Sequence, residues 1–214
     1  KRIERRGIRV QTTWGMTEIS PLGTATPAAA EVRDPATSGR PAIGIDLMLT
    51  DAGGQPLEEQ RDRAGHLWVR GPSVVERYFG HTASSTRDGW FETGDLARLD
   101  AHGTLTITGR SKDLIKSGGE WINPAEIEAI VGDHPDVSMA AVIGREHAKW
   151  GERPVLLVEL RRGADVSDEA ILKTLEGRVA NWWQPDAVLR LARMPLAATG
   201  KVDKLRLRSE YGRS

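Results

Sequence analysis

The chain contains no cysteine, so the sequence excludes a disulfide framework, a thiolate metal site and a cysteine nucleophile. It also lacks an excess of charge, because thirty Lys and Arg residues balance thirty Asp and Glu residues. A balanced surface does not attract nucleic acid or an anionic membrane, so we expect no nucleic-acid partner. The absence of cysteine fits a reducing, cytoplasmic location.

Long apolar runs are missing as well. No uninterrupted run approaches the roughly 20 residues of a membrane-spanning helix, so we expect no transmembrane segment. The basic start KRIERRGIRV is not followed by the apolar stretch of a signal peptide. It is typical of a helix end that runs into a strand, as if the chain began inside a fold, although a native N-terminal helix would also fit.

Metal-ligand spacing is absent among the five histidines. We interpret them as turn and surface residues: His66, His81, His102, His134 and His147.

Residues 43–108 contain short β-type runs that are separated by glycine turns. The runs are Gly44–Thr50, His66–Arg70 and Thr104–Thr108. This half of the chain is therefore predicted to form a small twisted β-barrel or sheet.

After Gly109 the pattern becomes mixed α and β. Asn123-Pro124-Ala125-Glu126 predicts a helix start, with Asn as N-cap, Pro at the first helical position and Glu at the third. A second helix is expected from Ser167, followed by an apolar stripe at helical spacing. The stripe is Ile171, Leu172, Leu175 and Val179; the expected strands are Val137–Ile143, Val155–Leu160 and Ala187–Leu191, and Asp203 could cap a short last helix. The whole chain is predicted to be α+β, with two helices on one small sheet in this half.

Four polar, glycine-rich segments need a chemical explanation, and the first is Thr13–Glu18 (TWGMTE). A hydroxyl and a carboxylate presented by a glycine turn suit a phosphate and a divalent cation. Thr17 could donate to a phosphoryl oxygen, and Glu18 could ligate Mg²⁺. An ordinary turn with a solvated glutamate explains the same residues.

The second segment is Trp90–Asp95 (WFETGD). We expect the aromatic run to stop at a tight turn that ends in Asp95. An aspartate in that place can accept both hydroxyls of a ribose. A simple β-turn with Asp in a favoured position is the alternative.

The third segment, Gly109–Ile122, joins the two halves and crowds charges and glycines together. Arg110 is positioned to reach back towards a ligand at the end of the β-rich half, and Gly118-Gly119 would permit close ligand approach. A charged linker followed by a β-hairpin explains the glycines but not the density of charge.

The fourth segment is Pro195–Lys201 (PLAATGK), a flexible turn that ends in a lysine. Such a lysine can serve as a mobile cation for a phosphate or a carboxylate. The segment is not a Walker loop, because the GxxxxGK[ST] spacing is absent. A surface lysine is the alternative.

Five motifs in their order along the chain resemble those of the adenylate-forming superfamily: WGMTE, GHLWVRGP, WFETGD, GRSKDLIKSGGEWINPAEIE and PLAATGKVDKLRLR. That superfamily includes acyl-CoA synthetases, luciferases and the adenylation domains of peptide synthetases, and the resemblance covers nearly the whole chain. KSGGEWINPAEIE and Trp182–Asp186 are most similar to the medium- and long-chain fatty acyl-CoA synthetase branch. The resemblance implies that residues 1–109 are the C-terminal portion of a large AMP-binding domain, with a β-barrel subdomain from about residue 25, and that residues 110–214 are a mobile C-terminal α+β domain.

The resemblance also implies roles for residues near the N-terminus. Thr17 would contact the AMP phosphate, and Glu18 would bind Mg²⁺. Trp14, which stands where a tyrosine is usual, would keep an aromatic face for adenine, with Gly15 beside it in the nucleotide site. Asp95 would accept the ribose hydroxyls.

Further along the chain, Arg110 would contact the same nucleotide, and Lys112 falls at the hinge. Gly118 and Gly119 fall in the loop that lines the pantetheine tunnel, with Lys116 as a neighbouring cofactor-binding residue. Lys201 matches the lysine that bridges acyl carboxylate, ribose and phosphate during adenylation.

The implied activity is that of a fatty acid–CoA ligase that uses ATP, Mg²⁺ and coenzyme A and passes through an acyl-AMP. The glycine- and Ser/Thr-rich phosphate loop and the acyl-binding walls of the family are absent, so we expect a C-terminal fragment that is inactive alone and whose cut surface could drive homodimer formation. Two alternatives stay open: an adenylating enzyme with another acceptor, such as a carrier-protein thiol, and a non-catalytic nucleotide-binding module.

Overall fold

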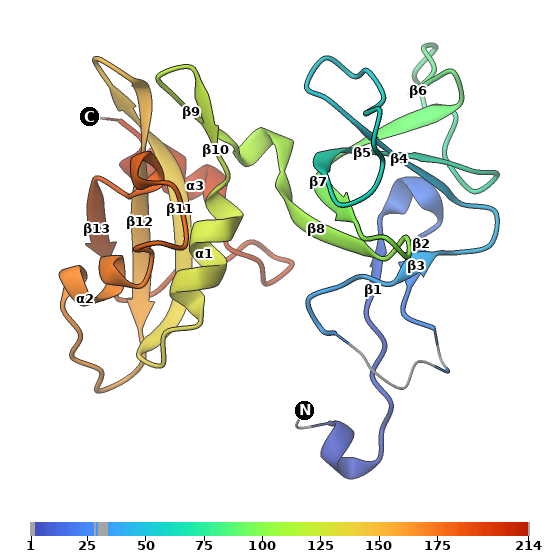
Figure 1. The fold of residues 1–214 in the computed structure, drawn as a ribbon. Helices are drawn as coiled ribbons and strands as arrows, with labels where there is room; N and C mark the ends of the chain where they lie inside the picture. Colours follow the sequence, from blue (N-terminus) through green and yellow to red (C-terminus); the bar gives the residue numbers. More distant parts are fainter. Residues whose placement is uncertain (1–2, 28, 30–33, 214) are drawn as a thin grey trace. The chain divides into compact units, whose positions relative to one another are not determined.

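The computed structural model describes residues 3–27, 29 and 34–213 (Figure 1). The chain divides into two compact units, Lys1–Ser111 and Lys112–Ser214, which we call the N-terminal unit and the C-terminal unit. Each unit has hydrophobic clusters of its own. Over the described ranges, no helix combines the length and the apolar character needed to cross a membrane.

The N-terminal unit is built from two antiparallel sheets and two single 3-10 turns, η1 (Glu4–Arg6) and η2 (Thr17–Ile19). The smaller sheet has the order β1-β2-β3, and the larger has the order β4-β5-β7-β6, with β8 paired to β7. The strands are β1 (Thr13–Gly15), β2 (Leu22–Ala25), β3 (Arg40–Pro41), β4 (Asp46–Thr50), β5 (Ala64–Arg70), β6 (Thr86–Arg87), β7 (Trp90–Leu99) and β8 (Leu105–Arg110). The β-rich character predicted for this half is confirmed.

The longest strand of this unit, β7, alternates strictly between buried and more exposed residues. This is the period of two that a strand shows when one of its faces is buried. The buried face carries Phe91, Thr93, Asp95, Ala97 and Leu99, of which the apolar members belong to the core of the unit. Asp95 therefore projects from the core face of the sheet, and the expectation that it ends a tight turn is wrong.

An irregular pairing explains why this part of β7 resembles a turn in the sequence. His66 pairs with Leu96, whereas Trp68 pairs with Glu92, so three residues of β7 lie opposite one residue of β5. Gly94, in the middle of the three, has φ +72°, which favours glycine. The Thr-Gly-Asp sequence is thus a β-bulge, a feature that bends a strand and redirects its side chains.

Strand β5 corrects the interpretation of one histidine. His66 is half-buried within β5 and is not a turn residue.

The C-terminal unit contains a five-stranded sheet and three α-helices (Figure 1). The sheet order is β10-β9-β12-β11, and β13 runs parallel to β12. The elements are η3 (Ser111–Asp113), β9 (Ile115–Ser117), β10 (Glu120–Ile122), α1 (Pro124–Gly132), β11 (Val137–His147), β12 (Gly151–Leu160), α2 (Asp168–Lys173), η4 (Asn181–Trp183), β13 (Ala187–Arg190) and α3 (Lys204–Tyr211).

Both faces of this sheet are covered. On one face, Val142 and Leu156 share a core with Ile127 of α1 and Ile171 of α2. On the other face, the alternate residues of the central strands, among them Ile143 and Leu157, pack with Leu207 of α3. The predicted α+β fold is confirmed, and α3 adds a third helix that buries the second face.

The helix starts follow the sequence signals. The side chains of Asn123, Ser167 and Asp203 accept hydrogen bonds from backbone N–H groups at the starts of α1, α2 and α3, at 3.1–3.2 Å. The end of the second helix was predicted too late. The helix ends at Lys173, and the rest of the apolar stripe continues in turns that include Gly177 at φ +68°.

Candidate functional site

A buried carboxylate with two side-chain partners forms the centre of the candidate site in the N-terminal unit. Asp95 is 3% exposed. Its Oδ2 accepts a hydrogen bond of 2.8 Å from the indole Nε1 of Trp14, and its Oδ1 lies 2.6 Å from Nε of Arg110. Asp95 and Arg110 are also register partners on β7 and β8. The structure therefore brings together three of the residues that the sequence singled out.

The bulge fixes the backbone of Asp95. The hydroxyl of Thr93 accepts a hydrogen bond from the Asp95 N–H at 3.1 Å and donates to the carbonyl of Leu67 at 2.7 Å. Each oxygen of the Asp95 carboxylate is thus engaged by one side-chain donor. Because half of the Arg110 side chain is exposed, the carboxylate lies beside a cation that reaches solvent. Such a group can accept the hydroxyls of a sugar.

Trp14 is held mainly by packing. The residue is 8% exposed and belongs to the core of the unit. A Cβ at Gly23 would overlap the Trp14 ring, so the ring requires glycine there. A Cβ at the neighbouring Gly15 would overlap the carbonyl group of Pro21, so the backbone requires glycine at that position. The ring therefore offers little free face, and its evident contribution is the N–H group that holds Asp95.

Thr17 and Glu18 lie on η2, directly after β1. Oε1 of Glu18 accepts a hydrogen bond of 3.0 Å from the hydroxyl of Tyr78, and the Glu18 carbonyl accepts one of 2.8 Å from the Val75 N–H. The hydrogen bond to Glu18, together with the negative charge of Glu18, raises the pKa of Tyr78 above its ordinary value of 10.0. Tyr78 lies 60 residues away from Glu18, and no local pattern in the sequence marks it.

Among the described residues, no group of three or more His, Asp or Glu side chains could hold a metal ion. Mg²⁺ typically takes one or two carboxylates and completes its octahedron with water and phosphate oxygens. Glu18 keeps one oxygen that Tyr78 does not contact, so it fits the role of a single protein ligand to a phosphate-bound Mg²⁺.

In the C-terminal unit, Gly118 and Gly119 form the turn between β9 and β10, and both have positive φ, +60° and +94°. The N–H of Gly118 donates to the carbonyl of Trp150 at 2.8 Å, and a Cβ at this position would lie 2.7 Å from the Trp150 ring. A Cβ at Gly119 would meet no atom within 4 Å. Gly118 is thus required by packing, whereas Gly119 faces open space.

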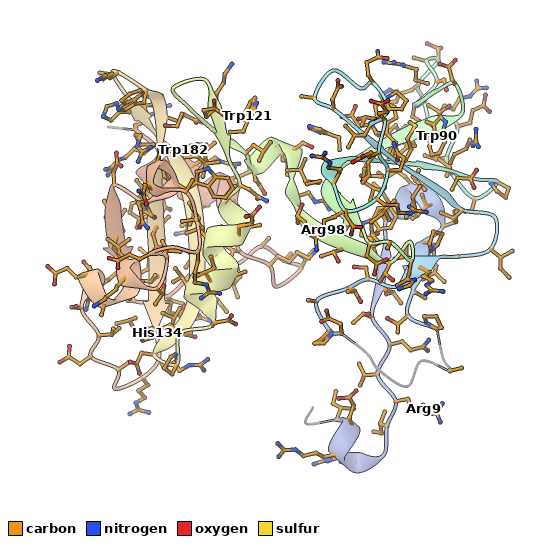
Figure 2. The ribbon with its side chains drawn as sticks, viewed as in Figure 1. Arg9, Trp90, Arg98, Trp121, His134 and Trp182 are labelled. Carbon is orange, nitrogen blue, oxygen red and sulfur yellow. The ribbon has the colours of Figure 1, made fainter. Side chains whose placement is uncertain are left out.

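Exposed tryptophans and lysines accompany this turn. Nζ of Lys116 lies 5.6 Å from the ring centroid of Trp121, and Nζ of Lys149 lies 4.6 Å from that of Trp150. Trp121, Trp150 and Trp182 are each more than 40% exposed; Figure 2 labels Trp121 and Trp182, which both belong to this unit. Flat rings beside ammonium groups are suited to an anionic ligand that also carries an aromatic ring.

Arg153 connects the turn region to the Trp182–Asp186 segment. Its guanidinium donates to the Ser117 hydroxyl at 3.2 Å, to the Trp182 carbonyl at 2.8 Å and to Asp186 at 2.8 Å. Its side chain is only 16% exposed. No local pattern in the sequence indicates this role, since the contacts cross about thirty residues of chain in each direction.

Lys201 lies on an exposed turn between β13 and α3. The turn is closed by a hydrogen bond of 2.8 Å from the Ala197 N–H to the Lys201 carbonyl, and by a bridge between Leu196 and Val202. Lys112, the predicted hinge, is exposed and lies in η3. Both residues belong to the C-terminal unit, whereas Asp95 belongs to the N-terminal unit.

Comparison with known families agrees with this arrangement. Residues 1–79 match the family described as AMP-binding enzyme, and residues 126–201 match the AMP-binding enzyme C-terminal domain. The chain therefore belongs to the AMP-binding, adenylate-forming enzymes.

Individual relatives make the likeness more specific. The chain is 43% identical to a 3-methylmercaptopropionyl-CoA ligase of Ruegeria lacuscaerulensis, over 97% of this chain and 40% of the relative. It is 42% identical to a medium-chain-fatty-acid–CoA ligase of Ectopseudomonas oleovorans, over 96% of this chain and 40% of the relative. The crystal structure of ATP-bound MatB from Rhodopseudomonas palustris matches with a TM-score of 0.87 and 33% identity, over 96% of this chain and 41% of that one. The chain thus spans about 40% of the length of the relatives it matches.

Proposed function

We propose that this chain is the C-terminal part of an ATP-dependent acid–CoA ligase. In the first half-reaction, a carboxylate oxygen attacks the α-phosphorus of ATP, and pyrophosphate leaves to give an acyl-AMP. In the second, the sulfur of coenzyme A, having lost its proton, attacks the acyl carbon, and AMP leaves to give the acyl-CoA. The observation that carries the proposal is the buried Asp95, whose carboxylate is held by Trp14 beside the partly exposed guanidinium of Arg110.

The N-terminal unit would hold the nucleotide in both half-reactions. Asp95 accepts the ribose hydroxyls, Arg110 contacts the same nucleotide, and Thr17 donates to the phosphate. Glu18 would hold Mg²⁺, which neutralises charge on the phosphate oxygens.

The C-terminal unit would supply groups that each half-reaction needs in turn. Attack of a carboxylate on a phosphate brings two anions together, so a positive charge must be present where charge accumulates. Lys201 supplies that charge during adenylation. Lys116, Gly118 and Gly119 would line the path of coenzyme A, which the exposed tryptophans and lysines around that turn support.

Alternation between the two half-reactions requires that the C-terminal unit rotate, and we place the hinge at Lys112. On this assignment, residues 1–109 belong to the large AMP-binding domain, with a β-barrel subdomain from about residue 25, and residues 110–214 form the mobile domain. The division of the chain between Ser111 and Lys112 supports this assignment.

For the acid we propose a fatty or similar aliphatic carboxylic acid. The support is the likeness to ligases that are named for medium-chain fatty acids and for 3-methylmercaptopropionate. We place the enzyme in the cytoplasm, consistent with a chain that has no cysteine. A homodimer is a further expectation, which light scattering would test.

The test uses the intact protein with ATP, Mg²⁺, coenzyme A and a series of straight-chain acids, and measures AMP and acyl-CoA by chromatography. We expect acyl-CoA to accumulate with free coenzyme A, and acyl-AMP to be trapped by hydroxylamine when coenzyme A is omitted. Product only with a carrier-protein thiol would favour the alternative acceptor. Binding of AMP without any turnover would favour a non-catalytic module.

The 214-residue chain alone provides a second test. We expect it to form no acyl-AMP, because the glycine-rich loop that grips the β- and γ-phosphates is not in this sequence. Formation of acyl-AMP by the pure chain would contradict this part of the proposal.

A further inference from the structure

A cluster of four charged side chains surrounds the first residues of the C-terminal unit. Oδ1 of Asp113 lies 2.8 Å from Nη2 of Arg208, and the same nitrogen lies 3.5 Å from the carbonyl oxygen of Lys112. Nζ of Lys204 lies 2.7 Å from Oε1 of Glu128 and 3.9 Å from Oδ2 of Asp113. The cluster joins η3 to α1 and α3.

These side chains are held inside the unit rather than on its open surface. Asp113, Lys204 and Glu128 have side chains 15%, 17% and 20% exposed. Two acids and two bases balance, so burial leaves no net charge uncompensated. Oε1 of Glu128 also accepts a hydrogen bond of 2.6 Å from the Val142 N–H of β11, and burial raises the pKa of Glu128 while the charge of Lys204 opposes the rise. The cluster therefore fastens Asp113 to the body of the unit.

A different contact holds Ser111, the last residue of the N-terminal unit, to the rest of that unit. Oγ of Ser111 lies 3.0 Å from Nδ1 of His66 on β5. His66 pairs with Leu96, which in turn pairs with Gly109 of β8, so this contact sits beside the bulge that carries Asp95.

Few backbone torsion angles separate the group held by Arg208 from the residue held by His66. The carbonyl of Lys112 and the N–H of Asp113 share one planar peptide group. If Arg208 holds that carbonyl and the Asp113 side chain, then both φ and ψ of Lys112 lie on the N-terminal side of the held group. Ser111, on the other side, is tied to His66 through its hydroxyl, so ψ of Ser111 is the one further backbone torsion between the two contacts.

We propose that His66 and Arg208 are positioning residues that confine rotation between the two units to ψ of Ser111 and the φ and ψ of Lys112. His66 holds the last residue of one unit through Ser111, and Arg208 holds the first peptide group of the other through Asp113. The inference rests on the proposed alternation of the C-terminal unit and adds to it the contacts that set the limits of the pivot. Lys201 and the Gly118-Gly119 turn would then move as one body, because the motion is absorbed before Asp113.

The first test measures amide hydrogen exchange in the intact protein. Arg208→Gln removes the charge that binds Asp113, and exchange at residues 112–114 should become about tenfold faster or more, as expected for loss of a charge-assisted hydrogen bond. Arg206→Gln is the matched control, because Arg206 lies on the same helix and pairs with the exposed Glu210. Arg208→Lys should restore part of the protection. Unchanged exchange in Arg208→Gln would overturn the proposal.

The second test measures the distance between spin labels at Glu58→Cys and Lys173→Cys, two exposed positions in different units, with any other cysteine of the intact protein removed. The parent should show one narrow distance with ATP and another with an acyl-AMP analogue and coenzyme A. Arg208→Gln and His66→Gln should broaden both distributions, and Arg206→Gln should leave them narrow. Equal widths in all variants, or one unchanging distance in the parent, would overturn the pivot.

The outcome also separates this inference from the proposed activity. If the label distances shift and broaden as stated while no acyl-CoA forms, the pivot stands and the activity assignment is wrong. His66→Gln acts in the other unit from Arg208→Gln, so a folding defect in one variant leaves the other to decide.

Discussion

Asp95 and Lys201, which we assign to the same reaction, are held in opposite ways. Asp95 is 3% exposed, lies on the core face of β7 and has each oxygen engaged by a side-chain donor. Lys201 lies on an exposed turn that is closed by backbone contacts. On this assignment, a group that must hold its ligand throughout is fixed in advance, whereas a group needed in one half-reaction is carried on an exposed turn.

The largest expected effect concerns Lys201, the group on the exposed turn. In the intact enzyme, Lys201→Ala should slow acyl-AMP formation by roughly 10²–10³, by analogy with removal of one preorganised charge donor. Formation of acyl-CoA from supplied acyl-AMP should change much less. Pyrophosphate exchange and single-turnover thioester formation measure the two steps, and Lys173→Ala, an exposed lysine of the same unit, is the control. Equal loss in both steps would refute the assignment.

The buried position of Asp95 predicts that its replacement lowers both the affinity for nucleotide and the stability of the fold. Asp95→Asn removes the charge beside Arg110, and we expect nucleotide affinity to fall roughly 10- to 100-fold, with about 1–3 kcal/mol lost from the free energy of unfolding. Calorimetric titration and denaturant unfolding measure these changes. Asp46→Asn is the matched control, since Asp46 makes an exposed pair with Arg70 on the same sheet, which contributes about 0–1 kcal/mol. Similar losses in both variants would show that Asp95 contributes no more than an exposed carboxylate on the same sheet.

A smaller effect is expected at the glycine turn. Gly118→Ala places a Cβ 2.7 Å from the Trp150 ring at a φ that disfavours alanine, so the turn must shift. We expect the KM for coenzyme A to rise several-fold while acyl-AMP formation is kept. Gly163→Ala carries a similar positive φ, +81°, but meets no atom within 4 Å, so it controls for backbone strain alone. If both variants raise the KM equally, the contact with Trp150 is irrelevant.

The smallest predicted effect concerns the titration of Tyr78. Glu18 raises the pKa of Tyr78. The Glu18–Tyr78 hydrogen bond therefore contributes its full stabilisation below about pH 10, and this stabilisation is lost as the pH rises through the raised pKa of Tyr78. Glu18→Gln should lower the pKa of Tyr78. Ultraviolet absorbance of tyrosinate follows this in the 214-residue chain, which has only one other tyrosine, Tyr211. A Tyr78→Phe variant assigns the signal, and an unchanged titration in Glu18→Gln would exclude the contact.

Local signals in the sequence predicted local structure well. Asn123, Ser167 and Asp203 cap helices because each cap involves a side chain and an N–H two or three residues later. The glycine-separated β runs correspond to strands of the larger sheet. These features are determined by neighbours in the sequence.

Features that depend on distant partners could not be predicted in the same way. The bulge at Gly94 exists only because β5 pairs with β7 in a shifted register, so WFETGD alone looked like a turn. The contacts of Tyr78 with Glu18 and of Arg208 with Asp113 join residues 60 and 95 positions apart. Motif resemblance identified Asp95 and Arg110, but their contact required the pairing of β7 with β8.

The most direct measurement compares the binding of AMP and 2′,3′-dideoxy-AMP to the intact enzyme and to its Asp95→Asn variant. If the Asp95 carboxylate accepts the ribose hydroxyls, loss of the hydroxyls should weaken binding to the parent roughly tenfold or more, as for hydrogen bonds to a charged group, and weaken binding to the variant far less. An equal loss in both proteins would show that the ribose lies elsewhere and would contradict the account.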